Sequence, residues 1–253
     1  MKRSVLALLV AALAGAACGN GSQDVTAPST STSSGSTQTF SGNLALQGSS
    51  FYSFTVTTTE TVSISLASLT ANSVGPASTS VVRLGLGVPS GTGCSVNNSV
   101  DTAAGLTAQL TTSVNPDVYC VNISDIGNLT DPMNFTIRIG ENLASSSSNT
   151  TAATATFASF LAIGGWSAQT FSVSQGGTIS ITLTSVTPSA IVGLGIGIPG
   201  SASSTCSLSR SLNATAGSQL TVAVDAGTYC AQVYDAGSLN GPGVAFSMTI
   251  GHP

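Results

Sequence analysis

Apolar and polar residues alternate with a period of two along most of this chain. A clear example runs through Val62, Ile64 and Leu66, which are separated by Ser63 and Ser65. In a β-strand, such alternation sends one set of side chains toward a core and the other set away from it. We therefore expect the three apolar residues to face inward and the two serines to face outward. No apolar stripe of helical period and comparable length follows the first 17 residues.

The alternation predicts seven or eight strands in the first half of the chain, each bounded by Gly, Pro, Asn or Ser. They are expected near residues 39–46, 51–57, 61–69, 81–88, 94–99, 106–112, 117–124 and 133–140. Short strands at this spacing, with no helices between them, are typical of antiparallel β-sandwiches. The fold class predicted is all-β, with jelly-roll or immunoglobulin-like sandwiches.

The second half of the chain repeats the first. Phe40 and Phe54 recur as Phe157 and Phe171, and the motif Leu-Gly-Leu-Gly-Val-Pro at 84–89 recurs as Leu-Gly-Ile-Gly-Ile-Pro at 194–199 after a deletion in the second copy. Each unit has about 100 residues, which is enough for a core of its own. The repeat therefore predicts two tandem domains, at 38–142 and 154–253, joined by a Ser-rich linker at 143–153.

The N-terminus has the pattern of an export signal. A basic start, Met1-Lys2-Arg3, precedes an apolar and small-residue run that ends at Ala17 and is too short to span a bilayer. The residues around Cys18 resemble the lipobox of bacterial lipoproteins, in which the Cys is acylated, although Gly15 stands where Leu is usual. The alternative is ordinary cleavage near Ala16 or Ala17. We expect a signal peptide at 1–17 and a lipidated Cys18 with a flexible Ser/Thr-rich tether at 18–37.

Charged residues form only 6% of the chain, against about 25% in an ordinary soluble domain. About 75 residues are Ser or Thr. Beyond the signal the cations are Arg83, Arg138 and Arg210, which are too few and too scattered for phosphate recognition. The composition therefore argues against a nucleic-acid partner.

The cysteines fit an exported chain. Cys94, Cys120, Cys206 and Cys230 form an even set, two in each domain, and predict two disulfides. Pairing Cys94 with Cys120 closes a loop of about 26 residues, worth roughly 3 kcal/mol in the chain-entropy model. Cys18 is then the odd cysteine, and lipidation gives it a use.

The end of each domain resembles a known family. Gly227-Thr228-Tyr229-Cys230-Ala231-Gln232-Val233, a Gly-rich turn and then Phe246-Ser247-Met248-Thr249-Ile250 resemble the end of bacterial pre-peptidase C-terminal domains. The resemblance implies a β-sandwich accessory module of an exported bacterial protein. It implies no activity of its own, because no peptidase domain accompanies the two modules.

Two aromatic residues of the second domain have no aromatic counterpart in the first. Trp166 and Tyr234 stand where the first domain has Ser49 and Ser124, and strand parity points both outward. Exposed aromatic rings can stack on sugars or hold a protein partner. The alternative is that they pack under a loop or between the two domains.

Other motifs have ordinary structural explanations. Gly195 to Gly200 fits G-x-G-x-x-G, but Pro199 and a Ser-rich turn follow where the nucleotide motif needs a helix. The strand glycines of both copies predict close approach of a covering loop, the sister domain or a partner. Asp125 and Asp235, each before a turn glycine, predict bonds to local backbone N–H groups rather than a calcium site.

No catalytic set, metal site or cofactor site is predicted, because His252 is the one histidine and no G-x-S-x-G occurs. The sequence thus favours a non-catalytic, exported lipoprotein, anchored in the outer membrane, that acts as a binding module. The alternative is a carbohydrate-binding module that uses Trp166 and Tyr234. Possible partners are a protein or glycan ligand, the membrane through the lipid, and a second copy through unprotected sheet edges.

Overall fold

The computed structural model describes residues 37–71, 75–141, 153–200 and 205–253. The predicted signal peptide, Cys18, the tether and most of the linker lie outside these residues. The first domain contains eight strands, which are β1 (Thr37–Leu44), β2 (Ser49–Val56), β3 (Glu60–Thr70), β4 (Val82–Ser90), β5 (Gly93–Thr102), β6 (Leu110–Val114), β7 (Asp117–Ser124) and β8 (Met133–Glu141). Within the described residues, no helix could cross a membrane.

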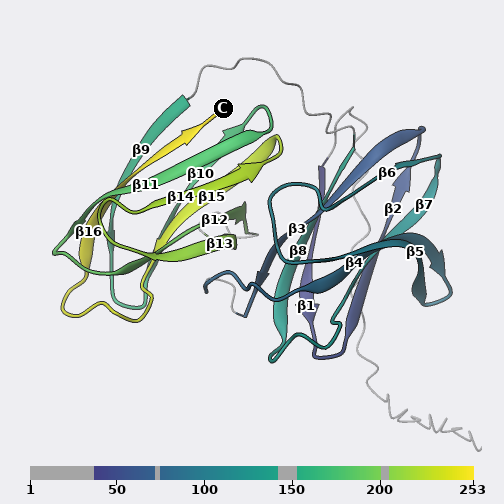
Figure 1. The fold of residues 1–253 in the computed structure, drawn as a ribbon, viewed down its shortest axis with the longest axis horizontal. Coiled ribbons are helices and arrows are strands. Elements are labelled where there is room, and N and C mark those ends of the chain that lie inside the picture. Colours follow the sequence, from purple (N-terminus) through teal and green to yellow (C-terminus); the bar gives the residue numbers. More distant parts are fainter. Residues whose placement is uncertain (1–36, 72–74, 142–152, 201–204) are drawn as a thin grey trace, which may run out of the picture.

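The second domain repeats this series (Figure 1). Its strands are β9 (Ala153–Leu161), β10 (Trp166–Val173), β11 (Gly177–Thr187), β12 (Val192–Pro199), β13 (Cys206–Ala214), β14 (Gln219–Val224), β15 (Gly227–Tyr234) and β16 (Val244–His252).

Each domain consists of two four-stranded antiparallel sheets. In the first domain the orders are β1-β8-β3-β6 and β2-β7-β4-β5, and in the second they are β9-β16-β11-β14 and β10-β15-β12-β13. Eight strands divided in this order form a jelly roll. The predicted all-β fold with two β-sandwiches is therefore confirmed, and the strand order favours the jelly roll over the immunoglobulin-like alternative.

The alternating residues build the two cores as predicted. Val62, Ile64 and Leu66 of β3 are fully buried, as are Ile179, Ile181 and Leu183 at the equivalent positions of β11. Each set packs against its own second sheet, so each domain has a separate hydrophobic core. Burial of one face of each sheet stabilises the sandwich by about 25 cal/mol per Å² of apolar surface.

One predicted strand is displaced. The sixth was expected at 106–112, but β6 begins at Leu110. The preceding loop contains Leu106, which is 2% exposed and belongs to the hydrophobic core of the second domain rather than its own. Periodicity alone assigned this residue to a strand because the pattern does not distinguish a residue buried in its own domain from one buried in a neighbour.

The strand glycines are explained by the adjacent strand. β13 has a bulge where it pairs with β12 between Ile196 and Gly197, and β5 has the same bulge opposite Leu86 and Gly87. A Cβ on Gly197 would overlap the carbonyl group of Ser207, and one on Gly195 would lie 2.6 Å from Leu208 Cδ1. Glycine is required here because a bulged backbone approaches closely. The close approach was predicted, but it comes from the adjacent strand rather than from a covering loop.

Both predicted disulfides are present. Cys94 pairs with Cys120 and Cys206 pairs with Cys230, at Cα–Cα distances of 5.8 and 5.9 Å. Each joins the bulged strand to the strand two places away in the same sheet, on the sheet's outward face. Two internal disulfides are consistent with an oxidising compartment.

The two domains meet through unlike faces. β12 and β13 of the second domain lie against β3 of the first (Figure 1). The outward-facing residues Ser63, Ser65 and Ser68 of β3 are only 7%, 8% and 2% exposed. They point away from their own core, as predicted, but small side chains on this face allow a second sheet to pack on it.

Polar contacts reinforce the junction at its edge. A carboxylate oxygen of Asp225, between β14 and β15, accepts a 2.9 Å hydrogen bond from the Ala108 backbone N–H. Arg138 of β8 donates a 3.2 Å bond to the Tyr229 hydroxyl, and its guanidinium lies 5.3 Å from the centre of that ring. Burial raises the pKa of Tyr229, so its hydroxyl stays protonated and donates to the Asp225 carbonyl at 2.6 Å.

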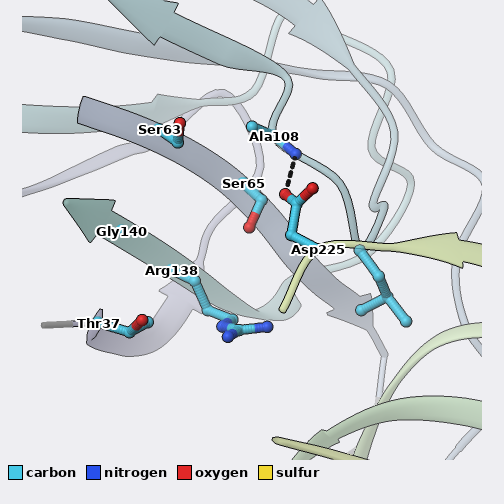
Figure 2. Close-up of a pocket in the computed structure, with 8 residues that line it drawn as sticks. Thr37, Ser63, Ser65, Ala108, Arg138, Gly140 and Asp225 are labelled. Carbon is cyan, nitrogen blue, oxygen red and sulfur yellow. Dashed lines mark hydrogen bonds between the residues drawn. The ribbon is translucent and has the colours of Figure 1, made fainter. Parts of the chain in front are cut away.

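Figure 2 shows Arg138 and Asp225 bordering a small cavity with Ser63 and Ser65. The cavity has a volume of about 10 Å³. It has no room for anything larger than a water molecule. This small cavity therefore belongs to the contact that holds the domains together and is too small to be a ligand site.

The two disulfides should differ in their rate of reduction under native conditions. Cys206 and Cys230 are 0% and 1% exposed beneath the first domain, whereas Cys94 is half-buried. Thiol–disulfide exchange needs access to a sulfur atom. We expect dithiothreitol to open Cys94–Cys120 first, and differential alkylation followed by peptide mapping measures the order. Equal rates, or faster loss of Cys206–Cys230, would contradict the buried junction.

Candidate binding site at the domain junction

Trp166 and Tyr234 lie directly opposite each other on neighbouring strands. Trp166 begins β10 and Tyr234 ends β15, and their Cα atoms are register partners. Because paired residues of antiparallel strands point to the same face, both side chains lie on the outward face of the sheet, as parity predicted. The structure therefore brings together the two residues that the sequence identified separately.

The two rings differ in exposure. Trp166 is 42% exposed and Tyr234 only 7%. The Tyr234 ring lies on the backbone of Gly193, where any Cβ would overlap it. Tyr234 also belongs to a cluster with Cys206, Leu208 and Cys230, against which Ala77 of the first domain packs. Tyr234 is thus held rigidly in place, and Trp166 presents the accessible ring.

A hollow of about 470 Å³ opens beside these aromatic residues. This volume is within the range of small-molecule sites. Most of the lining comes from the second domain, and Gly75 and Pro76 of the first domain complete the wall. The other lining residues are Gly164, Gly165, Trp166, Asn213, Tyr234, Asp235 and Ala236.

Asp235 fixes the loops that border the hollow. One of its carboxylate oxygens accepts a 2.8 Å bond from the Gly164 N–H, and the other accepts bonds from Gly237, Ser238 and Leu239. These backbone bonds, that from Gly164 foremost, lower the pKa of Asp235 below its ordinary value. The carboxylate therefore ties the turn before Trp166 to the loop after Tyr234.

The first domain contains the same device. Asp125 accepts a 2.8 Å bond from the Gln47 N–H and further bonds from Gly127, Asn128 and Leu129. The first of these is the main cause that lowers the pKa of Asp125. The prediction of local backbone bonds is confirmed in both domains, and the repeat shows that these carboxylates organise loops.

The first-domain residues of the hollow could not be assigned from the sequence. Gly75 and Pro76 belong to a segment of the first domain that the second domain lacks, and Ser211 Oγ accepts a 3.1 Å bond from the neighbouring Ala77 N–H. The length difference between the copies was the one available signal. The length difference marked a segment of the first domain that a jelly roll does not need, since the second domain folds without it.

Chemically, the hollow offers an aromatic surface with an amide and the Asp235 carboxylate at its border. The indole face supplies an apolar surface, and Asn213 supplies an amide that can both donate and accept hydrogen bonds. The Asp235 oxygens are already engaged by backbone N–H groups. The arrangement suits a neutral ligand with both a flat apolar face and hydroxyl groups.

No protein-family model and no curated protein matches the chain. Among solved structures, it is similar to a protein of the Sulfolobus turreted icosahedral virus, with 11% identity, coverage of 91% of this chain and 98% of that chain, and a TM-score of 0.26. It is also similar to the PBSX exported protein XepA, with 13% identity, coverage of 88% and 89%, and a TM-score of 0.32. A Paenibacillus xanthan lyase matches with 13% identity over 83% of this chain and 23% of that chain, with a TM-score of 0.22. Similarities this low carry no argument, so the jelly-roll assignment rests on the strand order.

Acid should weaken the domain ends that the two aspartates organise. Because the folded-state pKa of Asp235 lies below its unfolded value, its contribution to stability is present above about pH 4 and is lost as the pH falls through the folded value. We expect Asp235→Asn to lower the free energy of unfolding at pH 6 and to reduce its dependence on acid.

Urea unfolding at pH 6 and pH 3 measures this effect. Asp131→Asn is the matched control, since Asp131 accepts its bond from the Thr130 hydroxyl. An Asp235→Asn chain that loses as much stability on acidification as the unsubstituted chain would contradict the assigned role.

Proposed function

We propose that the chain is a non-catalytic, exported lipoprotein that acts as a binding module at the cell envelope. One observation carries the binding role: Trp166 and Tyr234, far apart in sequence, lie opposite each other at a hollow that residues of both domains complete. The two disulfides support export, because they persist in oxidising compartments. The sequence resemblance to pre-peptidase C-terminal domains supports an accessory role.

Anchoring in the outer membrane is the part of this proposal that rests on the sequence alone. The lipobox-like residues before Cys18 and the Ser/Thr-rich segment after it support an acylated N-terminus on a flexible tether. A single lipid-bearing residue would hold the two domains at the membrane surface while leaving their binding face accessible.

Mass spectrometry of the protein isolated from its membrane fraction tests the anchor. We expect an N-terminal peptide that begins at Cys18 and carries acyl chains, and we expect Cys18→Ser to move the protein into the soluble fraction. An unmodified N-terminus after Cys18 would remove the lipid from the proposal without affecting the binding role.

A carbohydrate ligand is the second candidate, and the geometry of the hollow favours it. Sugar rings present one apolar face and a rim of hydroxyl groups, which matches an exposed indole beside an amide. The described residues around the hollow offer no cation for an acidic ligand, and the Asp235 carboxylate is engaged by backbone N–H groups. A neutral saccharide therefore fits this surface better than an acidic ligand.

A glycan array probed with the folded protein tests this candidate. We expect binding to neutral saccharides that Trp166→Ala weakens about tenfold, which corresponds to about 1.4 kcal/mol. Phe160→Ala is the matched control, because Phe160 is a 56% exposed aromatic residue of the same domain outside the hollow. Binding that survives Trp166→Ala unchanged would exclude the hollow as the saccharide site.

A further inference from the structure

The domain junction joins two different sheet faces. Because the domains are repeats, each domain also has, away from the junction, the counterpart of the face that the other domain buries there. The first domain contributes the outward face of the β1-β8-β3-β6 sheet, and the second contributes the outward face of the β10-β15-β12-β13 sheet. By the repeat, β2-β7-β4-β5 in the first domain corresponds to the second of these sheets. Likewise, β9-β16-β11-β14 in the second domain corresponds to the first. These two sister faces lie away from the junction (Figure 1).

We call the first kind of surface the glycine face. In the second domain it contains Gly195, Gly197, Leu208 and the Cys206–Cys230 disulfide. The side chains of Leu208 and of both cysteines are at most 1% exposed. The bulge on β13 presses Leu208 over Gly195, and the buried side chain of Gln232, the register partner of Gly195, lies on the same face. It is the face that the first domain covers.

The first domain has its own glycine face with the same construction. Gly85 and Gly87 lie beneath the equivalent bulge, and Val96 takes the place of Leu208, with its Cγ1 2.7 Å from a Cβ built on Gly85. The Cys94–Cys120 disulfide completes it. Here, however, Val96 is 41% exposed and Val118 on β7 is 43% exposed. The equivalent surface is therefore buried in one domain and open in the other, where the exposed Arg83–Asp101 ion pair lies at one end of it.

The receiving surface is also repeated, and we call it the hydroxyl face. In the first domain Ser63, Ser65 and Ser68 of β3 form it and are buried at the junction. Their equivalents on β11 are Ser180, Thr182 and Ser185, which are half-buried in the second domain. Strands β9, β11 and β16 contain no Asp, Glu, Lys or Arg. Covering this face would therefore bury no charge from these strands, which lowers the cost of forming an interface.

We propose that the open glycine face of one copy docks on the open hydroxyl face of a second copy, repeating between chains the contact made within each chain. The two faces differ, so the interface is heterologous, and each added copy leaves one face of each kind free. The association is therefore head-to-tail and continues beyond a dimer. This inference does not depend on the ligand of the hollow or on the lipid anchor.

The contact between chains is weaker than the one within a chain. The second domain lacks an equivalent of Leu106, which is absent from its shorter loop, and has Thr249 in place of Arg138. The second domain also lacks a counterpart of the segment around Ala77, through which the first domain contacts Ser211. In addition, the covalent link within a chain gives the internal contact a high effective concentration. We therefore expect reversible association that grows with protein concentration.

Sedimentation velocity of the full chain carrying Cys18→Ser, which removes the acylation site, tests the proposal. The sedimentation coefficient is expected to rise with concentration. Val96→Arg blocks the open glycine face, and Thr182→Arg blocks the open hydroxyl face, so each variant alone is expected to remain monomeric. Leu46→Arg is the matched control, because Leu46 is 48% exposed in the β1–β2 turn, off both faces.

Mixing the two blocked variants gives the sharpest result. Each retains the face that the other has lost, so an equimolar mixture is expected to form heterodimers and nothing larger. Association through sheet edges or through two identical faces predicts instead that the mixture behaves like its components. If circular dichroism shows that Thr182→Arg folds poorly, Thr184→Arg replaces it, since Thr184 is exposed on the same strand.

A chain that stays monomeric at all concentrations would overturn the proposal. So would Val96→Arg and Thr182→Arg chains that still associate, or a mixture of the two that gives no dimer.

Discussion

The structure depends on the burial of one outward-facing strand surface, that of β3, by the second jelly roll. In an isolated domain Ser63, Ser65 and Ser68 would face solvent, and nothing in their own core requires them to be covered. Their small size lets β12 and β13 pack closely on β3, and their hydroxyl groups are less costly to desolvate than charges would be. Arg138, Tyr229 and Asp225 then fix the edge of this contact with directed hydrogen bonds.

The candidate binding site follows from that contact. Gly75 and Pro76 border the hollow only because the first domain is docked, and Ala77 helps to cover the cluster that holds Tyr234. Trp166 is positioned separately, by the turn that Asp235 ties to the loop after β15. The domains supply different parts of one surface: the second brings the aromatic residues and the first closes the wall. Duplication followed by divergence at Ser49 and Ser124, where the second copy has Trp166 and Tyr234, accounts for a site that only one domain carries.

The fold could be predicted from the sequence because its main constraint is local. Period-two alternation in segments such as 62–66 fixes which residues enter the core, and the internal repeat indicates two related domains. The four cysteines could be paired because each domain holds two. The outward direction of Trp166 and Tyr234 also followed from parity, but their proximity did not, because strand order within a sheet is not encoded in the alternation.

The junction was beyond sequence reasoning for a physical reason. Leu106 has the pattern of a strand residue, and its burial in the other domain depends on how two finished sheets pack. Similarly, the serines of β3 look like solvent-facing residues because hydroxyl side chains suit both water and a close sheet contact. The strand glycines were the informative exception, because a missing Cβ is costly in a strand and signals close approach. They correctly indicated a close approach. The expected covering loop is wrong, because the approaching backbone in both domains is the bulged neighbouring strand, and in the second domain the sister domain also docks on this face.

Cross-linking across the junction tests the docked arrangement most directly. Ala77 and Ser211 lie on opposite sides of it, with the Ala77 nitrogen 3.1 Å from Ser211 Oγ. The chain carrying Cys18→Ser, Ala77→Cys and Ser211→Cys is predicted to form a 77–211 disulfide within single chains under mild oxidation, at a rate independent of protein concentration. Two thiols that remain free, or that pair only between chains, would contradict the account.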